Sequence, residues 1–158
     1  MQGRWIKLTL ITYSILSMWP VMIDIALAIA RKAHAGQVDK ADVDYIQHPL
    51  YVASQVKTEQ EKAVALLHDV LEDSDITAAD LLAYGLSNEV VTAVQTLTKK
   101  KGQSYQDYLE KVKSNNLARV VKLADLKHNS DLSRLKTVSN TDYERVKKYK
   151  NAIRYLST

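Results

Sequence analysis

One segment of the chain places four ionisable side chains at the end of a strongly apolar run, Ala65-Leu66-Leu67-His68-Asp69-Val70-Leu71-Glu72-Asp73. On a helix, which turns about 100° per residue, all four project within one sector of ~140°. An unpaired buried aspartate costs several kcal/mol, so the pattern favours a metal or catalytic site. The alternative is that His68 is a hydrogen-bonded core histidine and that Glu72 and Asp73 end the helix in water.

Two further segments carry side chains of the same kinds. In Asp44-Tyr45-Ile46-Gln47-His48-Pro49, the imidazole of His48 can point into a groove because the following proline fixes the turn. Taken alone, His48 is better explained as a surface or capping residue. In Val121-Lys122-Leu123-Ala124-Asp125-Leu126-Lys127-His128-Asn129-Ser130-Asp131, an acid, Asp125, lies on an apolar helix, and Asn129 shares its face one turn later. A solvated face does not explain Asp125.

Together these segments supply a mixed set of nitrogen and oxygen ligands. The candidates are His48, His68, Asp69 and Asp125. Such a set suits manganese, iron or zinc, with water in the open positions. The catalytic metal centre is predicted from the types of these residues, because spacing along the chain does not show that residues from separate helices converge.

The elements that must position these residues are predicted to be helical. The chain has only 4 Gly and 2 Pro, and period-2 alternation is nearly absent. We predict an all-α bundle of about seven or eight helices, over roughly 22–35, 49–56, 59–71, 78–84, 88–97, 105–112, 116–127 and 142–156. The helix over 59–71 is so densely apolar that it must be central, and Thr77 and Ser87 are expected to cap the two helices that follow.

Composition restricts the class of protein. With 158 residues, 46% hydrophobic and 25% charged, the chain is long and apolar enough for one globular domain. The absence of cysteine excludes disulfides, thiolate nucleophiles and zinc fingers, and fits a cytoplasmic protein. The net charge of +4 is spread along the chain, so a small anionic partner is predicted and nucleic acid is not.

The first residues look like a poor signal sequence, with Arg4 and Lys7 before the apolar-leaning run Leu8–Trp19. The run is shorter than the ~20 residues of a membrane helix, and no small-residue cleavage site follows it. We therefore predict no membrane association and treat residues 1–21 as an N-terminal extension of uncertain role before a domain over 22–158. Export and an over-long start are the alternatives.

The order of four blocks indicates a family: Ala33-His34-Ala35-Gly36-Gln37, Tyr45-Ile46-Gln47-His48-Pro49, the segment 65–73, and Val121–Asp125 with His128-Asn129. The chain resembles the HD-superfamily phosphohydrolases from about residue 25 to 155. More closely, it is similar to the hydrolase domain of the RelA/SpoT enzymes and their small stand-alone relatives. The resemblance implies a helical HD domain that removes the 3′-diphosphate from guanosine tetra- and pentaphosphate with manganese.

The resemblance also implies a role for each matching residue. The implied metal ligands are His48, His68, Asp69 and Asp125. The implied catalytic pair, which positions or activates the attacking water, is Glu72 and Asp73. Asn129 would contact the nucleotide, and His34 would support the site without ligating the metal.

The loop 38–44 departs from the family, whose members usually carry an Arg/Lys-rich loop here. Only Lys40 is basic, while Asp39 and Asp42 would repel a guanosine polyphosphate. Asp131 likewise stands where many relatives have arginine. We expect Lys40, Lys122 and Asn129 to hold phosphate and sugar, although solvated charges explain the two lysines equally well.

Two other functions stay open at this point. One is a phosphatase acting on another nucleotide, such as a nicotinamide dinucleotide phosphate or a nucleoside monophosphate. The other is a sensor module that binds metal or nucleotide without turnover. The predicted partner is a small-molecule nucleotide in each case, and a homo-oligomer is compatible with the sequence.

Overall fold

The computed structural model describes residues 21–158, and all regular elements in this part of the chain are helices. They are α1 (Met22–Ala33), α2 (Gln47–Ser54), α3 (Glu59–Leu67), α4 (Val70–Asp73), α5 (Ala78–Ala83), α6 (Asn88–Leu97), α7 (Tyr105–Ser114), α8 (Asn116–Asn129), a 3₁₀ turn (Leu132–Arg134) and α9 (Asn140–Ser157). The predicted all-α fold class is confirmed. The predicted N-terminal extension lies outside the described residues, apart from Val21.

Helix α3 lies at the centre of the bundle, as its apolar sequence predicts. It packs against α1, α2, α6 and α8. Its side chains Ala63, Val64 and Leu67 have no exposed surface. Since α3 leads directly into His68, the fully buried centre of the core positions the candidate ligands.

The predicted helix over 59–71 is interrupted at His68 and Asp69, which form a turn between α3 and the single-turn helix α4. The His68 Nδ1 atom lies 2.7 Å from the carbonyl oxygen of Ala65. In an uninterrupted helix that oxygen would accept from the backbone N–H of Asp69, so the imidazole competes with helix continuation. The helix restarts at Val70, and its single turn is closed by the backbone N–H of Asp73, which donates to the Asp69 carbonyl at 3.0 Å.

The caps predicted for the next helices are present. Thr77 accepts a hydrogen bond from the Asp80 backbone and forms a capping box with it at the start of α5. The Ser87 hydroxyl accepts from the backbone N–H of Val90 at the start of α6. Within the described residues, no helix is long and apolar enough to cross a membrane.

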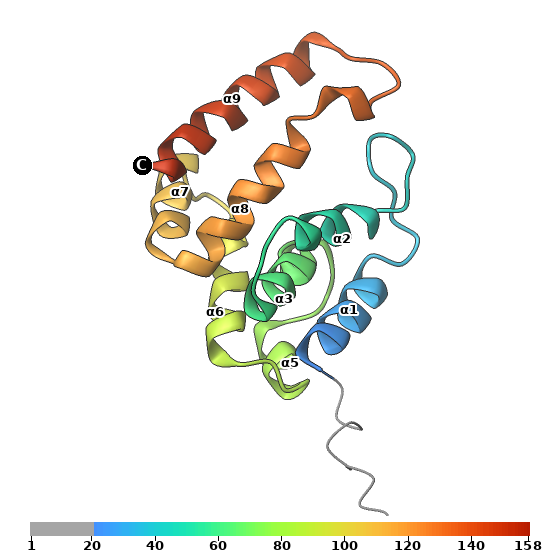
Figure 1. The fold of residues 1–158 in the computed structure, drawn as a ribbon, viewed down its shortest axis with the longest axis vertical. Helices are drawn as coiled ribbons and strands as arrows, with labels where there is room; N and C mark the ends of the chain where they lie inside the picture. Colours follow the sequence, from blue (N-terminus) through green and yellow to red (C-terminus); the bar gives the residue numbers. More distant parts are fainter. Residues whose placement is uncertain (1–20) are drawn as a thin grey trace, which may run out of the picture.

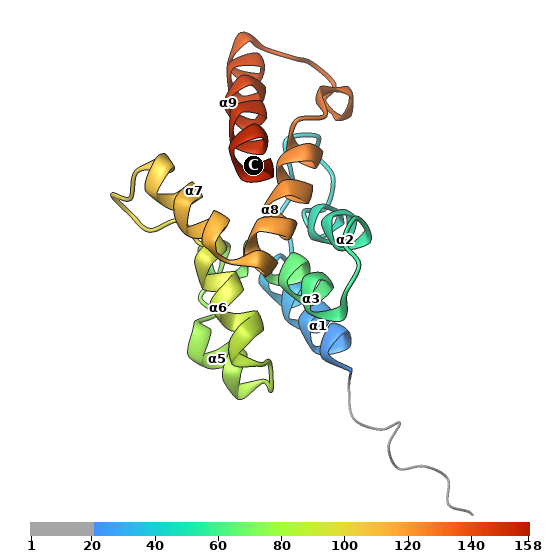
Figure 2. The same cartoon turned by 60° about the vertical axis from the view of Figure 1, so that its left-hand side comes forward.

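Two segments distant in sequence meet at one end of the molecule. Helix α9 folds back along α8, and the loop between α1 and α2 approaches the segment that joins α8 to α9 (Figures 1 and 2). Ion pairs from Asp39 to Arg134 and from Asp42 to Lys136 connect the two segments. This end of the bundle surrounds the candidate site.

Candidate metal centre and adjoining cavity

Three of the four predicted ligand residues, His48, His68 and Asp125, bring ligand atoms within 4.8 Å of one another inside the bundle, and Asp69 lies beside the two imidazoles. The Nε2 atom of His48 lies 3.2 Å from Nε2 of His68 and 3.1 Å from Oδ1 of Asp125. Nε2 of His68 lies 2.9 Å from Oδ2 of Asp69. The remaining imidazole–carboxylate separations, from His48 to Asp69 and from His68 to Asp125, are both 3.8 Å. The structure thus brings together residues from α2, α8 and the turn after α3.

Each imidazole is oriented through its other nitrogen. His68 Nδ1 donates to the Ala65 carbonyl, which leaves the Nε2 lone pair of a neutral ring free toward the centre. Nδ1 of His48 lies 2.7 Å from Nδ1 of His128, so one of these nitrogens donates to the other. Burial, followed by the neighbouring Arg134 and His48, lowers the pKa of His128 to about 4, so a neutral His128 can accept from His48.

The two carboxylates are held from outside the centre. The Tyr45 hydroxyl donates to Oδ2 of Asp69 at 2.6 Å. Asn129 Nδ2 donates to Oδ1 of Asp125 at 2.6 Å, and Lys122 Nζ forms an ion pair with Oδ2 of Asp125 at 2.8 Å. These contacts fix both acids in the ionised form that a cation requires.

The close packing of these ionisable groups shifts their pKa values. Burial raises the pKa of Asp125, but Lys122 and the two imidazoles outweigh it and hold the pKa below the usual range. Burial alone would lower the pKa of His68, but the carboxylates of Asp69 and Asp125 raise it to about 9. Protons and a cation therefore compete for the same lone pair.

The donor set fits a divalent cation. Ligand atoms about 2.1 Å from one ion are about 3.0–3.4 Å apart when the angle between them is near a right angle or tetrahedral. The shorter separations, from 2.9 to 3.2 Å, lie near this range. Two imidazole nitrogens and two carboxylate oxygens suit manganese, iron or zinc, and three of these residues, His48, His68 and Asp125, are buried.

The predicted catalytic pair, Glu72 and Asp73, lies on α4 and is exposed. Partial desolvation and the carboxylates of Asp69 and Asp73 raise the pKa of Glu72. Desolvation and Asp69 likewise raise the pKa of Asp73. Both acids are thus close enough to feel the charge of the centre without belonging to its converging ligand atoms.

His34 lies behind the centre. Its ring is 4.8 Å from the ring of Tyr45, and its Nδ1 atom is 2.8 Å from Oε1 of Gln37. Gln37 in turn donates to the Asp73 carbonyl at 3.1 Å. His34 therefore connects α1 to Tyr45 and to α4, and none of the converging ligand atoms belongs to it.

A cavity of about 310 Å³ opens beside the centre. Its wall includes His48, Tyr45 and Asn129 near the centre. Farther out it includes Lys40 from the loop, and Arg134, Arg145 and Tyr149. Of the residues predicted to hold substrate, Lys40 and Asn129 line this cavity, whereas Lys122 lies outside its wall and is engaged by Asp125.

Several residues of the site escaped sequence reasoning. Tyr45 and His128 stand inside the quoted blocks, so their positions next to His48 and Asn129 were an available signal. Arg134, Arg145 and Tyr149 stand outside those blocks. They reach the cavity only because the chain turns back after α8, which no local pattern indicates.

Known proteins resemble this chain in sequence and in fold. The chain is similar to the guanosine-3′,5′-bis(diphosphate) 3′-pyrophosphohydrolase of Haemophilus influenzae, with 38% identity over 115 aligned positions that cover 64% of this chain and 17% of the relative. It is similar to the bifunctional (p)ppGpp synthase/hydrolase SpoT of Escherichia coli, with 33% identity over 118 positions, 66% of this chain and 17% of that protein. No protein-family model matches the sequence.

A solved structure shares the fold. It is described as a metazoan ortholog of SpoT that hydrolyzes ppGpp and plays a role in starvation responses, and it matches with a TM-score of 0.72 at 22% identity over 89% of this chain and 88% of that one. The chain spans 17% of the length of the two curated relatives above. The resemblance to an HD-type hydrolase domain that the motifs indicate is confirmed.

Proposed function

We propose that this chain, which resembles the HD-type hydrolase domain of the SpoT enzymes, is a metal-dependent phosphohydrolase that removes the 3′-diphosphate from guanosine tetra- and pentaphosphate. In this reaction a water oxygen forms a bond to phosphorus while the bond from phosphorus to the 3′ oxygen breaks. The products are pyrophosphate and a nucleotide with a free 3′-hydroxyl. Relatives named for this activity support the proposal.

The observation that carries the proposal is the convergence of His48, His68, Asp69 and Asp125, with contacts of 2.9–3.2 Å that link the four ligand atoms. A cation held by these residues would lower the pKa of a bound water and would polarise a phosphoryl oxygen. We propose manganese as that cation. The chain contributes preorganised and largely buried ligands, which limit the choice of ions by donor type and spacing.

Glu72 is the proposed proton acceptor. The pKa of Glu72 is raised toward the working pH, and a carboxylate with a higher pKa is a stronger base. Asp73 lies next to it on α4 and is proposed to orient the water. General base catalysis of this kind contributes about 10²–10⁴-fold in rate.

The nucleotide is proposed to occupy the 310 Å³ cavity. Asn129, whose amide is fixed by Asp125, and Lys40, which is exposed on the opposite loop, would hold it there. Lys122 would act on the reaction through the charge of Asp125, because its Nζ is already engaged. We further propose that the domain spans 22–158 and works in the cytoplasm.

The test is turnover of guanosine tetraphosphate with manganese, followed by release of pyrophosphate. The parent should be active, while Asp69→Ala and Glu72→Gln should lose most of the activity. Glu110→Gln, an exposed acid on α7, is the matched control and should retain it. Equal turnover in all four proteins would overturn the catalytic assignment.

The product separates the other candidate functions. Release of inorganic phosphate instead of pyrophosphate, from this or another nucleotide, would indicate a phosphatase. A protein that binds manganese but releases neither product from any nucleotide tested would be a sensor module.

A further inference from the structure

The outer wall of the cavity carries arginines that are already neutralised. Arg134 Nη2 forms an ion pair with Oδ2 of Asp39 at 2.7 Å. Arg145 Nη1 lies 2.9 Å from Oδ1 of Asp142. With Lys40 and Asp131, the wall and its ion-pair partners comprise three cations and three carboxylates, so their formal charges cancel.

The Asp39–Arg134 pair is built into the loop and is only partly accessible, with side chains 15% and 28% exposed. The second oxygen of Asp39 accepts from the backbone N–H groups of Ala41 and Val43 at 2.8 and 3.1 Å. Arg134 Nη1 donates to the carbonyl of His128 at 3.3 Å. Both partners are therefore fixed before any ligand arrives.

The Asp39–Arg134 pair also lies between two cavities at this end of the molecule. Asp39 and Arg134 line the cavity beside His48, and both also line a second cavity that Tyr51 and His128 border. Loss of the Asp39 charge alone would leave the Arg134 guanidinium free for an anion at the boundary of the two cavities. Asp39 thus sets the charge that the outer wall presents to a ligand.

We propose that Asp39 is a specificity-determining residue which, by neutralising Arg134, selects nucleotides with few phosphates at the end remote from the reacting 3′-diphosphate. This inference rests on the proposed function. An anionic group that reaches the outer wall meets a neutralised arginine, so the wall offers no net attraction to offset the desolvation of each added phosphate, and that cost grows with their number.

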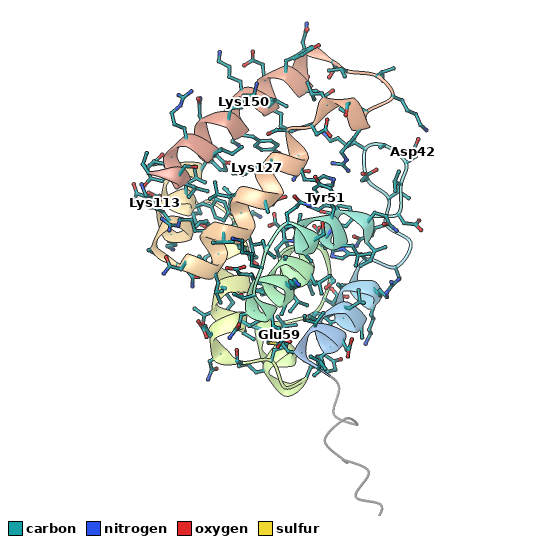
Figure 3. The ribbon with its side chains drawn as sticks, in the orientation of Figure 1. Asp42, Tyr51, Glu59, Lys113, Lys127 and Lys150 are labelled. Atoms are coloured by element: carbon teal, nitrogen blue, oxygen red, sulfur yellow. The ribbon has the colours of Figure 1, made fainter. Side chains whose placement is uncertain are left out.

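The neighbouring Asp42 provides a matched control. It lies near the outer end of the same loop (Figure 3), forms an ion pair with Lys136, and both side chains are largely exposed, at 76% and 73%. Asp42 borders neither of the two cavities that Asp39 lines. Its backbone φ of 60° is one that asparagine tolerates, so Asp42→Asn repeats the charge change of Asp39→Asn without touching the wall.

The experiment compares guanosine 3′-diphosphates with one, two or three phosphates on the 5′ oxygen, with kcat/KM measured in manganese. The parent should prefer one phosphate over three by about tenfold or more. Asp39→Asn, whose amide oxygen can still accept from Ala41 and Val43, should shrink or reverse this preference by about tenfold. Asp42→Asn should keep the parent's order, and Arg134→Gln added to Asp39→Asn should cancel the gain.

A binding series keeps this inference separate from the proposed function. The same nucleotides are titrated into the Glu72→Gln protein, with and without Asp39→Asn, so that no turnover is needed. If the parent hydrolyses none of them, the proposed function fails, and the order of affinities alone decides the role of Asp39. Equal preference across the series in the parent, equal shifts from Asp39→Asn and Asp42→Asn, or no binding at all would overturn the inference.

Discussion

The Nε2 atoms of His48 and His68 face each other at 3.2 Å, although the two residues are separated by α2, a turn and all of α3. Each ring is held from behind, one by His128 and the other by the Ala65 carbonyl. Two nitrogens do not attract each other at this distance unless a proton or a cation lies between or beside them. The carboxylates of Asp69 and Asp125 complete that environment.

Cation binding should therefore stabilise the fold. At a free manganese concentration of about 100 times Kd, linkage adds about 2.7 kcal/mol, which raises Tm by about 5–10 °C for a domain of this size. Asp125→Asn should abolish most of the shift measured against its own metal-free Tm. Asp75→Asn, an exposed carboxylate beyond α4, should keep it. The same shift in both variants would show that manganese binds elsewhere.

Glu72 gives the reaction a definite pH dependence. Partial desolvation and the charges of Asp69 and Asp73 raise its pKa, so the basic form is lost as pH falls through that raised value. The acid limb of the kcat profile should lie above the range of an ordinary glutamate. In Glu72→Gln, kcat should fall by about 10²–10⁴-fold and the limb should disappear, with KM nearly unchanged.

The raised pKa of Glu72 affects stability in the opposite direction from activity: ionisation of Glu72 favours the reaction but destabilises the fold. A raised folded-state pKa contributes stability that is fully present below the unfolded-state pKa and is lost as pH rises through the folded-state value. Metal-free Glu72→Gln should therefore match or exceed the parent in stability at neutral pH. A parent that gains stability relative to the variant as pH rises would contradict the assigned shift.

The fold was accessible from sequence because its determinants are local. Apolar periodicity placed the helices, Thr77 and Ser87 predicted two caps, and the dense apolar run of α3 predicted the centre. The break at His68 was not predicted, because it depends on an imidazole that takes a backbone carbonyl from the helix. Helix-wheel angles across that segment therefore do not describe the site.

The site was accessible only in part, for a related reason. Its inner residues follow one another in recognisable blocks, whereas the outer wall forms by a long-range approach of the loop 37–44 to the chain after α8. The Asp39–Arg134 contact joins residues 95 positions apart. Charge patterning assigned Asp39 and Asp42 the same repulsive effect, and only the fold distinguishes the paired residue on the wall from the exposed one.

Lys122 should prove more important for stability than for substrate. Its Nζ holds Asp125 at 2.8 Å with both side chains largely buried, at 18% and 5% exposure. Removing one partner of a buried pair costs about 3–5 kcal/mol, because the other charge is left without compensation. Lys122→Met should lower the free energy of unfolding by about that amount in urea titrations with a chelator present.

Lys136→Met is the control for this change. It removes a lysine from the exposed pair with Asp42, and exposed pairs contribute about 0–1 kcal/mol. Losses of equal size in the two variants would mean that Lys122 is a solvated charge and that Asp125 is stabilised by the imidazoles alone.

Tyr45 should set the affinity for the cation through Asp69. Its hydroxyl donates to Oδ2 of Asp69 at 2.6 Å, and burial together with the Asp69 charge raises the pKa of the phenol, so it stays a donor at all working pH values. Tyr45→Phe leaves the ring against His34 but frees the carboxylate to rotate. Loss of such an outer hydrogen bond weakens metal binding by about 10–100-fold, which calorimetric titration with manganese would measure.

Tyr51→Phe provides the comparison for Tyr45→Phe. The Tyr51 ring stacks on the His128 ring, with 4.0 Å between the ring centroids, on the other side of His48. Deleting its hydroxyl keeps that stack and touches neither carboxylate, so manganese affinity should stay within about twofold of the parent. If Tyr45→Phe binds manganese as tightly as the parent, or if both variants weaken equally, the hydrogen bond to Asp69 does not organise the ligands. In that case the ligands would be positioned by the turn after α3 and by Asp125 alone.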